Sequence, residues 1–158
     1  MADMVKAREV YEGLIDMFDA RNWTYTRHDD DLVLSSGVKG DDLPIEFIVA
    51  VRAENQVVQL LSRLPFEIPE NKRVDAACAI CYVNNKILDG SFDYDLFEGK
   101  ITFRLTSSYR DSELGSDLFG YMVDVSAATI DVYNDRLFML AKGVVDFSGF
   151  VQMEENSN

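Results

Sequence analysis

The stretch over residues 70–105, ENKRVDAACAICYVNNKILDGSFDYDLFEGKITFRL, decides the fold, because it predicts a helix that runs into a β-hairpin. Glu98-Gly99 is a two-residue turn signal in which the glycine supplies a positive φ. If Phe97 pairs with Lys100, then Asp93 faces Arg104 on one side of the ribbon. The other side is then apolar and carries Phe92, Tyr94, Leu96, Ile101, Phe103 and Leu105. A slip of one residue would turn this set outward, so the pairing is well specified.

The preceding segment predicts a helix over residues 2–21, where apolar side chains recur at helical spacing between charged ones. Strands follow at 23–28 and 32–36, and the acidic tip Asp29-Asp30 turns them so that Tyr25 lies opposite Leu34. Pro44 then opens a clearer strand at 45–53, which Glu54-Asn55 turns into 56–62. This second hairpin pairs Val51 with Val58 and Val49 with Leu60 on its inner face.

The outer face of the 45–62 hairpin is less polar than one solvated face of an antiparallel sheet normally is. Ile48 pairs with Leu61 there, with Ala50 and Val57 nearby. Either a helix or a partner covers this face. Because exposed apolar surface marks interfaces, Ile48, Val57 and Leu61 are the candidate interface residues.

Two more helices complete the expected domain. One starts near Glu70 and carries Val74, Ala77, Cys78 and Cys81 inward. The last has Ser116 as its N-cap and Gly143 as its C-cap. Its apolar stripe comprises Phe119, Met122, Ile130, Tyr133, Leu137 and Leu140.

These elements predict an α+β fold, in the order α-β-β-β-β-α-β-β-α, with a mainly antiparallel sheet and helices packed on it. We expect residues 1–145 to form a single domain. Residues 146–158 are expected to be a C-terminal tail that Phe147, Phe150 and Val151 dock on the core and that ends in disorder.

Charge and composition limit the classes of partner that the protein can bind. The chain has 158 residues and a net charge of −13, which argues against a nucleic-acid or anionic-membrane surface and suits a basic protein partner. Its first twenty residues hold no apolar signal core, and its longest uncharged run, residues 76–85, is too short to span a membrane. We therefore expect a cytoplasmic protein.

No catalytic, cofactor or metal residue is predicted. Cys78 and Cys81 have C-x-x-C spacing, but they lie inside a helix, where packing explains them better than redox chemistry. The only histidine, His28, precedes three aspartates at an expected hairpin tip, and turn chemistry accounts for them. Phosphate-binding glycine loops are absent, so the sequence does not indicate an enzyme.

Several segments carry a resemblance to a known family: PENKR at 69–73, VNN at 83–85, GSFDYD at 90–95, GKITFR at 99–104 and SDLF at 116–119. The chain resembles the YbjN-type domain, also called bacterial sensory transduction regulator-like, over residues 5 to 143. That family is similar in fold to type III secretion chaperones, which are small, acidic, usually dimeric proteins that bind an extended segment of a partner. No catalytic residues are assigned in the family, and the paired cysteines depart from its pattern.

The resemblance and the mixed face of the 45–62 hairpin together predict a non-catalytic, dimeric binding module, chaperone-like or regulatory. Two alternatives stay open. One is a redox- or metal-responsive regulator that uses Cys78 and Cys81. The other is an acidic mimic that occupies the nucleic-acid-binding site of a basic protein.

Overall fold

The structure, a computed structural model, describes residues 3–157, so position 2 of the expected first helix lies outside the described residues. The elements follow in the order α1 (Met4–Ala20), β1 (Tyr25–His28), β2 (Val33–Lys39), β3 (Pro44–Arg52), β4 (Val57–Glu67), η1 (Glu70–Lys72), α2 (Arg73–Asn84), β5 (Ser91–Asp95), β6 (Lys100–Ser108), α3 (Ser116–Ala141) and α4 (Phe147–Asn156).

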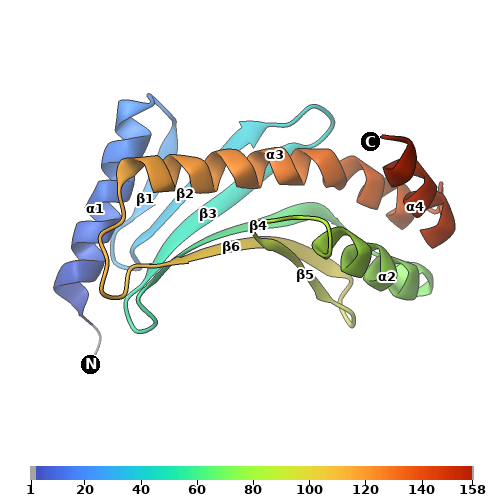
Figure 1. Cartoon of the computed structure of the whole chain (residues 1–158), viewed down its shortest axis with the longest axis horizontal. Helices are drawn as coiled ribbons and strands as arrows, with labels where there is room; N and C mark the ends of the chain where they lie inside the picture. Colours follow the sequence, from blue (N-terminus) through green and yellow to red (C-terminus); the bar gives the residue numbers. More distant parts are fainter. Residues whose placement is uncertain (1–2, 158) are drawn as a thin grey trace.

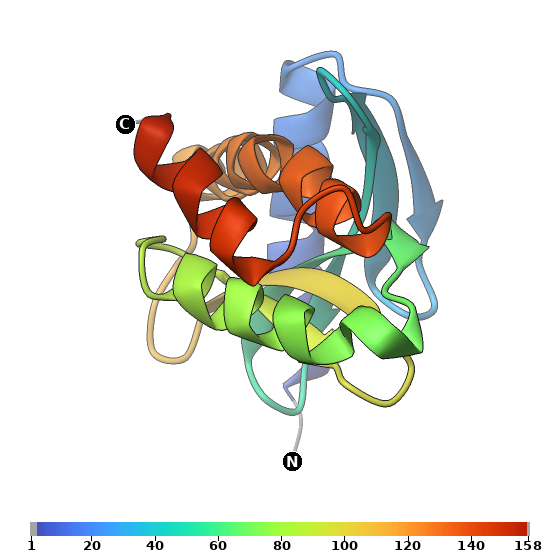
Figure 2. The same ribbon diagram turned by 90° about the vertical axis from the view of Figure 1, so that its right-hand side faces the viewer.

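The strands form one antiparallel sheet in the order β1-β2-β3-β4-β6-β5, and the helices pack on one side of it (Figures 1 and 2). The long helix α3 crosses the sheet, with α1 at one end and α2 and α4 at the other (Figure 1). The core lies between these layers, and its largest members are aromatic. The predicted α+β class is confirmed.

The β3–β4 hairpin has the predicted register. Val51 pairs with Val58, Val49 with Leu60 and Ile48 with Leu61. The two-residue alternation on the inner face determines which side chains are buried, and the turn expected at Glu54-Asn55 selects this pairing among those related by even shifts. What the pattern does not indicate is the neighbour of β4, which is β6, so that two hairpins far apart in sequence join into one sheet through this pair.

The predicted registers of the other two hairpins are wrong by two residues. Asp95 pairs with Lys100 and Tyr94 with Ile101, while Tyr25 lies opposite Ser36 rather than Leu34. Both hairpins close through four-residue turns instead of two-residue ones. An even shift preserves the faces, so Phe92, Ile101 and Phe103 still point into the core, and Arg104 still binds Asp93.

The longer β5–β6 turn follows from the side chain of Asp95. Its Oδ1 atom accepts hydrogen bonds from the backbone N–H groups of Phe97 and Glu98, each at 2.9 Å. These bonds hold the pKa of Asp95 below its usual range, because they favour the carboxylate. Leu96 and Phe97 therefore sit in the turn, where Phe97 is 86% exposed, and they do not extend the apolar face.

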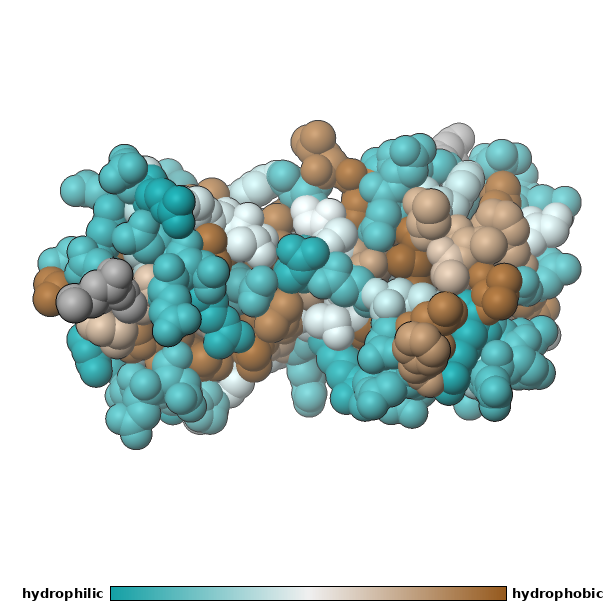
Figure 3. All heavy atoms as spheres, turned by 90° about the horizontal axis from the view of Figure 1, so that it is seen from below, coloured by the Kyte–Doolittle hydropathy of each residue, from teal (hydrophilic) through white to brown (hydrophobic). Residues whose placement is uncertain are grey.

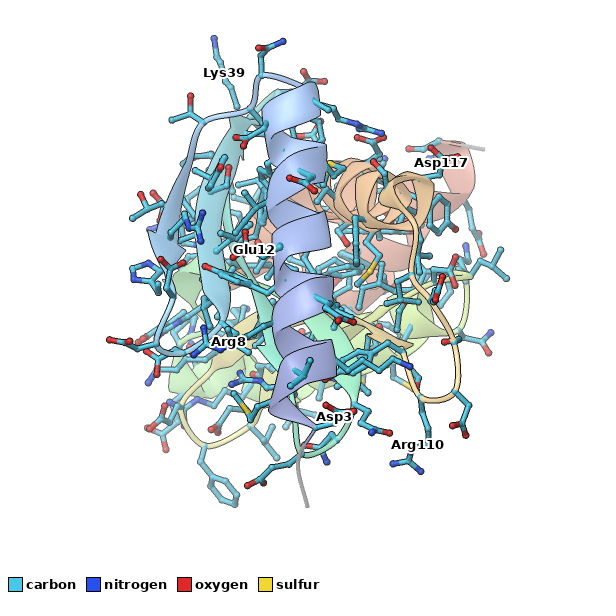
Figure 4. All side chains as sticks on the ribbon, turned by 90° about the vertical axis from the view of Figure 1, so that its left-hand side faces the viewer. Asp3, Arg8, Glu12, Lys39, Arg110 and Asp117 are labelled. Atoms are coloured by element: carbon cyan, nitrogen blue, oxygen red, sulfur yellow. The ribbon has the colours of Figure 1, made fainter. Side chains whose placement is uncertain are left out.

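Helix α1 is amphipathic as predicted. Asp3 caps it by accepting from the N–H of Lys6 at 3.0 Å, and Tyr11, Leu14 and Phe18 are buried. Its outward side carries charged residues, including the labelled Arg8 and Glu12 (Figure 4). This side of the molecule is therefore a solvated surface.

The predicted inward face of α2 is wrong. The buried residues are Ala76, Ala79, Ile80 and Val83, whereas Val74 is 72% exposed and both cysteines are exposed. Apolar residues surround this short helix on nearly every side, so its sequence does not favour one face over another. Contacts with β5, α3 and α4 decide which stripe is buried.

Helix α3 buries most of the predicted stripe, with Tyr133 half-buried, and Gly143 follows its end at φ +71°. Ser116 is its first residue, and Gly115 occupies the cap position. The expected tail differs from the structure, because residues 147–156 form helix α4 and only 157 is left beyond it among the described residues. Phe150 is fully buried, and Glu154 is buried where it pairs with Arg136.

Candidate protein-binding surface

The outer face of the sheet, opposite the helices, carries the three residues that the sequence marks as an interface. Ile48, Val57 and Leu61 are each partly exposed, while their inward neighbours on β3 and β4 are buried. Of the two coverings that the sequence left open, a helix is excluded among the described residues, because all helices pack on the other side (Figures 1 and 2). The role of these residues as an interface stays a prediction.

A hollow of about 590 Å³ opens over Ile48 and Leu61. Its rim is polar and comes from five strands, with Thr26, Ser35, Glu46, Arg63 and Thr102 among its lining residues. An apolar floor within a polar rim is the usual composition of a recognition surface.

A second hollow, of about 640 Å³, continues from the first, since Glu46 and Arg63 line both. It follows β4 past Leu64, Pro65 and Phe66 to Glu67. In this part the pairing of β4 with β6 is irregular between Arg63 and Glu67, as at a β-bulge. The two hollows together form a depression along β4 from Leu61 to Glu67, which we call the β4 groove; at about 3.3 Å per residue it is roughly 20 Å long.

Cys78 and Cys81 lie together on the outward side of α2, in an exposed stripe with Val74 and the half-buried Ala77. The spacing of 74, 77, 78 and 81 is that of one helix face. Seen from below, apolar side chains stand out in the right-hand half of the molecule, where α2 and the β5–β6 hairpin lie (Figure 3). The cysteine pair is therefore accessible, contrary to the packing role that the sequence favoured.

The acidic tip around His28 is a structural turn. Asp29 accepts from Arg27 at 2.8 Å and from the hydroxyl of Tyr11 at 3.1 Å, and the guanidinium of Arg27 lowers the pKa of Asp29. His28 contacts the hydroxyl of Ser35 through Nε2 at 3.1 Å. Within residues 3–157, no three side chains of the metal-ligating types gather in a suitable group.

The sequence analysis missed one further apolar surface, on the outward side of α3. Tyr121 and Val132 are 46% and 48% exposed there, next to Leu88 at 95%. The steps from 121 to 125, 128 and 132 are helical, so the pattern was present in the sequence. The buried stripe of α3 is stronger and concealed it.

Across the described residues, α3 included, no helix combines the length and the apolar character that crossing a bilayer requires.

A comparison with known families assigns the chain. The profile of the YbjN family, described as "Putative bacterial sensory transduction regulator", matches residues 11–139, which include every strand and most of α1 and α3. The chain belongs to the YbjN family. Helix α4 lies beyond the matched residues. No curated protein sequence matches the chain.

Solved structures share the fold at low identity. YbjN from E. coli superposes with a TM-score of 0.60 at 12% identity, covering 84% of this chain and 92% of its own. A chain of the HopA1-SchA chaperone-effector complex gives 0.57 at 12% identity, over 85% of this chain and 99% of that one. A chain of the ExsC-ExsE complex gives 0.60 at 13% identity, over 83% and 95%. The predicted likeness to YbjN and to type III secretion chaperones is confirmed at the level of fold.

Proposed function

We propose that this YbjN-family chain is a non-catalytic binding module of the cytoplasm, chaperone-like or regulatory, that works as a dimer and holds an extended segment of a protein partner. The observation that carries the proposal is the first hollow of the β4 groove, whose apolar floor of Ile48 and Leu61 lies on the face of the sheet that no described helix covers.

The groove suits an extended segment for geometric reasons. It follows a strand, so its floor presents side chains at the two-residue repeat of an extended chain. Ile48 and Leu61 supply one apolar position, and Pro65 supplies the next. Phe66 also lines the second hollow, but its ring packs edge-on against Phe138 of α3 at 5.3 Å between centroids. Between the two apolar positions, Glu46 and Arg63 offer one charge of each sign, which can fix the register of a bound segment.

The similar structures support this proposal by analogy. One of them is a complex between a chaperone and an effector. Because the net charge of the chain is −13, it would attract a basic segment more strongly than a neutral or acidic one. Val57 lies four residues from Leu61 on β4 and extends the same face toward the other end of the strand.

The substitution Leu61→Asp tests the interface role of this face. By multi-angle light scattering, the wild type should have the mass of a dimer, and the variant should shift toward the mass of one chain. Its apparent melting temperature should fall, because a dimer interface contributes to stability by mass action. The control is Val5→Asp, which adds the same charge at an exposed apolar position on α1, away from this face.

A strictly monomeric wild type, with Leu61→Asp changing neither mass nor stability, would contradict the proposed interface. If the wild type is a dimer and the Leu61→Asp variant is also a dimer, the two chains must contact each other through another surface.

A second function rests on the exposure of Cys78 and Cys81, which favours a redox- or metal-responsive regulator. Two thiolates leave a zinc ion two ligands short. A second copy of the chain would supply them. Zinc titration of the reduced protein should then give one ion per two chains. The third candidate, an acidic mimic, has only the net charge in its favour.

A further inference from the structure

Helix α3 has a second apolar face besides the one that packs on the sheet. Tyr121, Val125, Ala128 and Val132 lie along it at steps of four, three and four residues. Tyr121 and Val132 are about half exposed, and Ala128 is exposed. At 1.5 Å per residue this face is roughly 16 Å long, which is three helical turns.

The connection between α2 and β5 forms the opposite wall. Ile87, Leu88 and Asp89 face α3 across a hollow of about 350 Å³, which we call the α3 groove. Tyr121 donates its hydroxyl to Asp89 and so joins the two walls; this bond raises the pKa of Tyr121. Tyr133 also lines the groove, and its ring packs edge-on against core residue Phe92 at 6.0 Å between centroids. The base of the groove is thus anchored to the core.

The charged groups around the α3 groove are mainly acidic. Asp89 lines it, and Asp117 and Asp124 are exposed on the N-terminal half of α3 (Figure 4 shows Asp117 at its start). Arg21 binds Asp124 through both carboxylate oxygens, at 2.9 and 3.1 Å. Lys86 precedes the loop, and its ammonium lies 4.3 Å from the centre of the Tyr82 ring. Arg136 lies 5.9 Å from the centre of the Tyr133 ring and is paired with Glu154. Three cations against four carboxylates, on a chain of net charge −13, leave this surface attractive to positive charge.

We propose that the α3 groove binds a basic amphipathic helix of a protein partner. Its walls are a helix and a loop, which offer no strand edge for an extended peptide to pair with. An apolar stripe of three turns matches a helix that places anchors at i, i+3, i+4 and i+7. The acidic surroundings match Lys or Arg beside those anchors, and they disfavour nucleic acid and anionic lipid.

This site is separate from the β4 groove and does not depend on the function proposed above. Its residues come from α3 and the loop before β5, whereas those of the β4 groove come from strands β1, β2, β3, β4 and β6. Substitutions can therefore address each site alone.

Fluorescence anisotropy with a labelled synthetic peptide tests the inference on the full chain. The probe is a leucine–lysine peptide of roughly 14 residues with leucine at helical spacing, long enough for three to four turns. It should bind wild type, and Leu88→Asp and Val132→Asp should each weaken binding about tenfold or more, because each removes an apolar side chain that the bound peptide would bury. Val132→Ser should weaken it as well, without any change in charge.

The matched controls are Val74→Asp and Phe97→Asp, which add the same charge at exposed apolar positions outside the α3 groove. They should leave peptide affinity within about twofold, since surface changes away from the site alter only long-range attraction. A leucine–glutamate peptide of the same pattern should not bind measurably.

The inference is overturned if the peptide does not bind, if the controls weaken binding as much as Leu88→Asp, or if the acidic peptide binds equally well. It is also overturned if Leu61→Asp abolishes peptide binding while Val132→Asp leaves it unchanged, because the helix would then occupy the β4 groove. If Leu61→Asp does not change the mass of the protein, the proposed interface on the sheet is contradicted, but the peptide-binding test of the α3 groove is unaffected.

Discussion

Gly99 shows how much one residue contributes where two elements meet. Its φ of +74° confirms the positive φ expected from the sequence, and it is buried against the chain that leads into α2. The N–H of Ile68 donates to the Gly99 carbonyl at 2.8 Å. A Cβ atom on Gly99 would lie 2.2 Å from the carbonyl oxygen of Ile68. The β5–β6 turn therefore packs here only because no side chain is present.

Gly99→Ala should reduce the free energy of unfolding by about 2 kcal/mol or more, because it adds a backbone clash to an unfavourable φ. Urea denaturation measures this. The control is Gly13→Ala inside α1, where the new Cβ would meet Phe119 at an ordinary 3.6 Å. That change should stabilise the protein by about 0.5–1 kcal/mol, since alanine is the better helix former. Equal effects of the two substitutions would contradict the close packing at Gly99.

At the scale of elements, α2 is the clearest case of a helix whose orientation depends on its neighbours. Tyr94 donates to the carbonyl of Arg73, and both Asn84 side-chain atoms bind the backbone of Phe92, at 2.8 and 3.0 Å. These bonds attach α2 to β5 at both ends and settle the rotation of the helix. They turn Ala76, Ile80 and Val83 inward and leave the cysteines outside.

Both cysteines should react with a thiol reagent in the native protein at rates close to those in the denatured chain. Cys78→Ser and Cys81→Ser should each change the free energy of unfolding by no more than about 0.5 kcal/mol, as exposed substitutions usually do. Ile80→Ala, on the buried side, should cost about 2–4 kcal/mol. Labelling that appears only after denaturation would show that the stripe is covered, as in a dimer.

At the scale of the whole molecule, the excess of acidic side chains acts on the fold itself. Like charges repel more in the compact state than in the extended one. Most of the ion pairs, such as Arg27 with Glu12 and Asp29, are exposed and contribute little. The chain is therefore held together by its core against a net repulsion.

The melting temperature should consequently rise by a few degrees as NaCl increases from about 10 mM to about 200 mM, because the screening length falls from roughly 30 Å to below 10 Å. Calorimetry or circular dichroism measures it, and KCl serves as the control, since the effect depends on ionic strength alone. Sulfate is avoided because it stabilises folded proteins by exclusion. A melting temperature that falls or stays constant with NaCl would mean that attractive pairs outweigh the repulsion.

The sequence by itself determined the elements and their faces wherever the apolar period was unambiguous. The alternation at 45–51 and the turn expected at Glu54-Asn55 together specified the β3–β4 register, and the stripe that begins at Phe119 specified the buried side of α3. The segments at 90–104 indicated the family, which the profile match confirms. Local spacing carries this information, because burial of one face follows directly from the period.

Tertiary structure alone decided the hairpin turns, the exposed side of α2 and the presence of α4. The side chain of Asp95 closes its turn with hydrogen bonds that the apolar pattern of the sequence does not reveal. A shift of the strand pairing by two residues leaves that pattern unchanged. A helix that is apolar all round has no intrinsic inward side. The candidate sites also depend on tertiary structure. In the β4 groove, and likewise in the α3 groove, segments that are far apart in sequence line the same hollow. Spacing along the chain cannot place such residues together; packing against the shared core does.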